Sequence, residues 1–171
     1  MRRVPPPAAG VHWAVPGRRL LSEREVRATV AAALEHGGRP GLRVEVVFVA
    51  DRALARLHAR HLGDARPTDV ITFDLTGGAG AEAELYVSVQ RARAEARARG
   101  LAPERELALY LVHGCLHLCG FDDRAPRARA RMRRAEAEVL GRLGYAPEPG
   151  RARSGRTRTR SARGIPRRAP G

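Results

Sequence analysis

The chain has 171 residues, enough for one domain with a substantial core. Its 32 basic residues are all arginine and outnumber the 18 acidic residues, so the formal net charge is +14 and polyanions are the favoured partners. No run approaches the roughly 20 apolar residues that cross a membrane, and two cysteines do not make a disulfide framework. We therefore expect a cytoplasmic protein and exclude a membrane-spanning or disulfide-stapled one.

Strand and helix patterns alternate along the chain. Valine-rich or alternating segments predict strands at 11–15, 42–50, 70–75 and 85–89. Helical periodicity and start and stop residues predict helices at 22–35, 51–62, 88–100, 104–118 and 126–143. Ser22 with Glu25 is a capping box, and Asp51 and Ser88 are expected to cap the second and third helices. Together these elements predict an α/β fold, a small mixed β-sheet of about four strands packed with about five helices.

The two ends differ from the middle in composition. Residues 1–10 are basic and proline-rich and predict a flexible extension, while residues 11–145 carry the domain. Residues 146–171 hold eight arginines and one glutamate, so +7 of the +14 lies there, and the near absence of large apolar residues predicts a disordered tail. The tail is either an RNA-binding arm or a low-complexity extension, and the sequence leaves both open.

The segment 113–123 carries the clearest chemical signal. His113 and His117 are four residues apart on a predicted helix, so both imidazoles leave the same face one turn apart. Gly120 can end the helix and turn the chain back, which brings Asp122 or Asp123 beside them. Three such ligands leave a fourth position for water, as in catalytic zinc sites, although histidines on an apolar helix are also common core residues. Zinc would lower the pKa of its water toward about 7 and polarise a phosphoryl oxygen.

The spacing resembles in outline the metal helix of zincin-type proteases. Those enzymes need a glutamate as general base directly after the first histidine, and Gly114 stands there. The predicted zinc site therefore suits a different reaction.

Two segments resemble the YbeY family of ribosomal RNA maturation endoribonucleases. Residues 113–123 match its His-Gly-x-Leu-His-Leu-x-Gly-Tyr-Asp-His motif, with phenylalanine for tyrosine and Asp123 in place of the last histidine. Residues 67–73 read Pro-Thr-Asp-Val-Ile-Thr-Phe and match a second motif. The resemblance implies one Zn²⁺ per chain held by His113, His117 and Asp123. It also implies a single-strand-specific endoribonuclease in small-subunit rRNA 3′-end maturation and ribosome quality control, with the small ribosomal subunit or its precursors as partner.

Further site residues follow from the acids and arginines of the matching region. Asp69, Glu84 and Asp122 are candidates for orienting ligands or moving protons. The family's functional arginine is replaced by Leu62, so Arg60 and Arg66 become the candidates for binding RNA phosphates. We expect a monomer. Two other functions stay open: a ribosome-associated RNA-binding protein with a degenerate site, and a metal-dependent peptide hydrolase.

Overall fold

The structure, a computed structural model, describes residues 9–63, 68–75, 82–148 and 162–163. Within these residues the chain forms five helices and five strands. Their order is β1 (Ala9–Trp13), α1 (Glu23–His36), β2 (Arg43–Val49), α2 (Asp51–Leu62), β3 (Val70–Asp74), β4 (Glu82–Ser88), α3 (Val89–Arg99), α4 (Pro103–Leu118), α5 (Pro126–Arg142) and β5 (Ala162–Arg163). The predicted α/β fold is confirmed. None of the described helices is long and apolar enough to cross a membrane.

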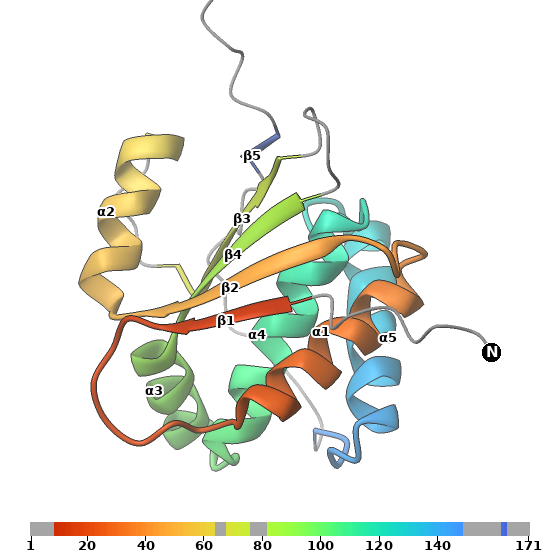
Figure 1. The fold of residues 1–171 in the computed structure, drawn as a ribbon. Helices are drawn as coiled ribbons and strands as arrows, with labels where there is room; N and C mark the ends of the chain where they lie inside the picture. The colour runs from red at the N-terminus through yellow and green to blue at the C-terminus, as the bar shows by residue number, and fades with distance from the viewer. Residues whose placement is uncertain (1–8, 64–67, 76–81, 149–161, 164–171) are drawn as a thin grey trace, which may run out of the picture.

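The strands form one mixed sheet in the order β1-β2-β4-β3-β5 (Figure 1). Strands β1, β2 and β4 run parallel, and β3 is antiparallel to β4. The predicted sheet of about four strands corresponds to β1 to β4. The short fifth strand comes from the segment predicted to be a disordered tail, and its two residues pair with Phe73 and Asp74 of β3. The rest of that tail, from residue 149 on, lies outside the described residues, as does the predicted N-terminal extension except for Ala9 and Gly10.

Helices cover the two faces of the sheet unequally (Figure 1). Helices α1, α3, α4 and α5 pack on one face and share the larger core cluster with the side chains of Val44, Leu85 and Val87. Among the described helices, α2 alone packs on the other face, over a small cluster that contains Leu54 and Ile71. Because side chains alternate between the faces of a strand, this division decides which residues of β3 and β4 can reach the helix that carries the histidines.

Helix α4 is the central helix of the larger core. Pro103 occupies its first turn, where the missing backbone N–H costs nothing, and every residue from 106 to 118 is buried. The helix lies very close to the sheet at Gly114. A Cβ atom there would lie 2.3 Å from Cδ1 of Leu85 and 3.1 Å from Cγ2 of Val70. The absence of a side chain at residue 114 therefore lets α4 lie directly on β3 and β4.

Two of the three predicted N-cap residues are confirmed. Ser22 accepts a hydrogen bond from Glu25 N–H, and Glu25 returns one to the Ser22 backbone, which confirms the capping box. Ser88 caps α3 through the N–H of Arg91. The cap predicted at Asp51 is wrong: Ala50 is the N-cap, and the Asp51 carboxylate instead accepts a hydrogen bond from the Ser88 hydroxyl. The Asp51 side chain is therefore bound to Ser88, outside α2, and does not cap the N-terminus of that helix.

Candidate metal centre

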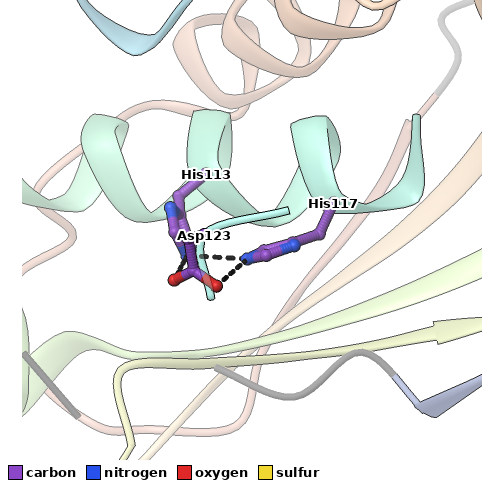
Figure 2. A group of neighbouring side chains, drawn as sticks. All are labelled: His113, His117 and Asp123. Carbon is purple, nitrogen blue, oxygen red and sulfur yellow. Dashed lines mark hydrogen bonds and ion pairs between the residues drawn. The ribbon is translucent and has the colours of Figure 1, made fainter. Parts of the chain in front are cut away.

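His113 and His117 project from the same side of α4, one turn apart (Figure 2). Only 5% of His113 and 8% of His117 is exposed, so both rings are removed from bulk water. Their Nε2 atoms are 3.0 Å apart. The predicted pairing of the two imidazoles on one helix face is thus present as a buried pair of facing nitrogens.

The turn after α4 brings an acid back to this pair. Gly120 has a φ of +92°, and the N–H groups of Gly120 and Phe121 bond to the carbonyls of His117 and Leu116. This is a Schellman motif, in which glycine takes the left-handed position beyond the helix end. The reversed chain places the Asp123 carboxylate over the histidines, with Oδ2 3.9 Å from Nε2 of His113 and Oδ1 3.9 Å from Nε2 of His117. Of the two acids that the sequence left open, Asp123 is therefore the one that faces the pair.

The outer ring nitrogens determine where the histidine protons lie. Nδ1 of His117 is 2.9 Å from the carbonyl oxygen of Phe121, which can only accept, so Nδ1 is the protonated nitrogen. Nδ1 of His113 is 2.6 Å from a carboxylate oxygen of Glu136 and donates to it in the same way. In its neutral form, each ring then presents the Nε2 lone pair to the interior of the cluster. Partners of this kind orient the histidine ligands of protein metal sites.

Burial and charge act differently on the two rings. Burial and the neighbouring His113 lower the pKa of His117 to about 4, so His117 is neutral at pH 7. Burial also opposes a charge on His113, but the hydrogen bond and charge of Glu136, aided by Asp69 and Asp123, outweigh it and raise the pKa of His113. The acids around His113 thus favour a positive charge at the cluster, while His117 stays neutral, which is the form that binds a metal.

The geometry of these three residues fits a tetrahedral metal ion. Ligand atoms at 2.0–2.2 Å from a tetrahedral zinc ion lie roughly 3.4 Å from one another. The two Nε2 atoms are 3.0 Å apart, each has an Asp123 oxygen at 3.9 Å, and one ligand atom from each of the three residues lies within 4.8 Å of the others. Oδ1 of Asp123 is buried and has no hydrogen-bond donor among the described residues. Two facing lone pairs and an unsatisfied carboxylate oxygen are costly without a cation between them. Within the described part of the chain, His113, His117 and Asp123 are the one group placed to hold a metal.

Comparison with known proteins agrees with this site. The family model described as Endoribonuclease YbeY matches residues 18–144. The chain belongs to the YbeY family. An Endoribonuclease YbeY of Chlorobium phaeovibrioides is 31% identical over 127 residues, which are 74% of this chain and 86% of the relative. That of Pelotomaculum thermopropionicum is 42% identical over 108 residues, 58% of this chain and 71% of the relative. The solution structure of TM1509 from Thermotoga maritima shares the fold, with a TM-score of 0.55 and 24% identity over 86% of this chain and 99% of that one.

Two of the three acids expected beside the YbeY-like cluster act on it through their charge, Asp69 on His113 and, as the smallest of several contributions, Asp122 on His117. Asp69 lies just before β3 and is close enough to raise the pKa of His113. The Asp122 carboxylate faces outward instead, where it accepts hydrogen bonds from Arg124 Nε at 3.0 and 3.1 Å. That hydrogen bond to Arg124 lowers the pKa of Asp122 and makes it a turn-stabilising group.

Glu84 lies across the sheet from the metal cluster. Its neighbour Leu85 points at Gly114 of α4, so Glu84 must point to the face that α2 covers. There its carboxylate accepts a hydrogen bond of 3.1 Å from the hydroxyl of Tyr86. The predicted strand began at residue 85, whereas β4 begins at Glu82 and includes Glu84, whose position in the alternation keeps it away from the histidines.

The arginine candidates are only partly described. Arg60 is exposed on α2, and Arg66 lies outside the described residues. Leu62, in the place of the family's functional arginine, packs half-buried on the small cluster under α2. The residue in that place therefore contributes to packing in this chain.

Sequence reasoning missed one residue that belongs to the site. Glu136 of α5 is 4% exposed and holds His113 through Nδ1. A signal was present, because Glu136 stands one turn from both Met132 and Leu140 on the apolar stripe of its helix. A carboxylate at such a core position needs a buried partner, and here the partner is a candidate metal ligand.

Proposed function

We propose that this protein is a zinc-dependent, single-strand-specific endoribonuclease that matures the 3′ end of small-subunit ribosomal RNA and serves ribosome quality control. Its partners would be ribosomal RNA and the small ribosomal subunit or its precursors, met as a monomer in the cytoplasm. The main support is the facing pair of Nε2 atoms, 3.0 Å apart, with the buried Asp123 oxygen beside them, in a member of an endoribonuclease family. The net charge of +14 supports an RNA substrate.

The ligand set assigns a role to each residue. His113, His117 and Asp123 would hold one Zn²⁺ per chain and leave its fourth position open. Zinc so held supplies a Lewis acid for a phosphoryl oxygen and lowers the pKa of water toward neutrality. Glu136 and the Phe121 carbonyl keep both imidazoles turned inward.

The remaining candidates have positions that limit what they can do. Asp69 would exchange a proton near His113, a role supported by the effect of its charge on the pKa of that ring. Arg60 and Arg66 stay proposals for phosphate contacts. Glu84 and Asp122, which face Tyr86 and Arg124, have no part in the proposed reaction.

A peptide hydrolase is the weaker alternative. The glutamate that zincin proteases carry after the first histidine would have to stand at residue 114. The Cβ atom of any side chain at residue 114 would clash with Leu85, so the close contact between α4 and the sheet excludes a glutamate base at this position. The other alternative, an RNA-binding protein with a degenerate site, is supported only by Leu62, which stands in the place of the family's functional arginine.

One experiment separates these three functions. Zinc-loaded protein is incubated with a small-subunit rRNA precursor and with casein, and the RNA ends are mapped. We expect the protein to cleave single-stranded RNA near the mature 3′ end and to leave casein intact. His117→Ala should not cleave the RNA. Binding of the precursor without new ends would indicate the degenerate site, and casein fragments would indicate the protease.

A further inference from the structure

A hollow lies on α4 toward its N-terminal half, between α4, α5 and the segment that follows α5. It has a volume of about 510 Å³, within the range of small-molecule sites. Leu109 of α4 and Leu140 of α5 form apolar wall, and the half-buried ring of Tyr145 adds a flat surface. The lining suits a planar ring more than a flexible chain, because an aromatic face offers stacking.

The outer wall of the hollow is held in place by polar contacts. The N–H of Tyr145 bonds to the carbonyl of Leu140 at 3.0 Å. Nε of Arg105 donates to the carbonyl of Ala146 at 3.1 Å, and Arg99 forms an ion pair with Glu148. The cavity is therefore bounded by a fixed segment and is open to a ligand of defined shape.

Two guanidinium groups line this cavity with unused hydrogen-bonding capacity. NH1 of Arg105 is buried and has no acceptor among the described residues. Arg133 is exposed and forms no ion pair within the described residues. The nearby carboxylates are engaged elsewhere, Glu136 with His113 and Glu148 with Arg99. Planar guanidinium groups match the oxygens of a phosphate.

The cavity and the metal cluster share Glu136, which lines the one and holds a ligand of the other. The residues of α4 that border the cavity lie about eight positions before the histidines, roughly 12 Å along the helix axis. A stacked nucleic-acid strand covers that span with about four nucleotides.

We propose that this cavity binds one nucleotide unit, with the base against Tyr145 and Leu140 and the phosphate on Arg105 and Arg133. The unit comes either from the RNA that the metal cluster cleaves or from a free nucleotide, and only the first source rests on the proposed function. Both sources present the same chemistry, a planar base joined to a phosphate.

The test is titration of the zinc-loaded full chain with adenosine 5′-monophosphate by calorimetry. Arg133→Gln removes a charged phosphate contact and should weaken binding about tenfold. Arg134→Gln, the adjacent exposed arginine outside the lining, should leave binding unchanged. Gly141 lines the cavity, and a Cβ there would meet no other atom within 4 Å. The leucine side chain of Gly141→Leu should therefore occupy the space of the ligand and abolish binding. No binding by the wild type, or binding that survives both cavity variants, would overturn the proposal.

A competition experiment then identifies the source of the nucleotide. A single-stranded RNA that displaces the mononucleotide from wild type identifies the cavity as a subsite for substrate, and Arg133→Gln should then raise KM about tenfold at unchanged kcat. Joint binding of both identifies a free nucleotide. Because neither titration needs turnover, loss of RNA cleavage with retained mononucleotide binding would contradict the proposed function alone.

Discussion

The close contact of Gly114 with the sheet yields the sharpest stability prediction. In Gly114→Ala the new Cβ would lie 2.3 Å from Leu85, 3.1 Å from Val70 and 3.3 Å from Thr72, against about 3.5–4.0 Å for normal contact. Overpacking of this kind costs about 1–3 kcal/mol. A gain of about 1 kcal/mol in helix propensity opposes it.

Gly141→Ala is the matched control, because a Cβ at residue 141 of α5 meets no atom within 4 Å. Both variants gain helix propensity, so Gly114→Ala should have a free energy of unfolding about 1–3 kcal/mol lower than Gly141→Ala. Urea unfolding measures this difference. Adding Leu85→Ala to Gly114→Ala should relieve the clash and give a favourable coupling energy. Equal stability of the two single variants would refute the close approach of α4 to the sheet.

Three further predictions concern the metal ligands and the tail. Asp123→His should keep zinc, since histidine is the ligand usual in the family, while Asp123→Ala should weaken it; equal zinc content in both would remove Asp123 from the ligand set. Glu136→Gln should weaken zinc affinity about 10- to 100-fold in a chelator competition, and Glu138→Gln, exposed on the same helix, should not. Removal of the residues after Pro149 deletes eight arginines and should flatten the salt dependence of RNA affinity by about 0.7–0.9 per lost phosphate contact, with zinc content unchanged; an unchanged slope would mean that the tail makes no such contact.

Local patterns predicted the parts of this molecule that local forces determine. The spacing of His113 and His117 and the glycine at 120 were enough to foresee paired imidazoles, a helix end and a returning acid, because each follows from helix geometry within about ten residues. The local spacing left Asp122 and Asp123 open, and only the resemblance to the family favoured Asp123. The choice between them depends on Arg124, whose side chain holds the Asp122 carboxylate outward.

Contacts between distant elements account for the rest. Glu84 was a candidate because it is an acid beside a predicted strand in the region that resembles the family, but which face of the sheet it occupies depends on how β4 pairs with β2 and β3. Glu136 comes to His113 from 23 positions away through the packing of α5 on α4. The role of Gly114 likewise became clear only from its distance to Leu85 on the sheet.

The most direct test of the central claim is RNA cleavage measured against zinc occupancy. The protein is stripped with a chelator, zinc is returned in steps, and the initial rate of cleavage of a single-stranded RNA is recorded at each step. We expect the rate to rise in proportion to bound zinc and to saturate at one ion per chain, and we expect His117→Ala to lack both the bound ion and the activity. Full activity of the stripped protein, or of His117→Ala, would contradict a metal-dependent site at His113, His117 and Asp123.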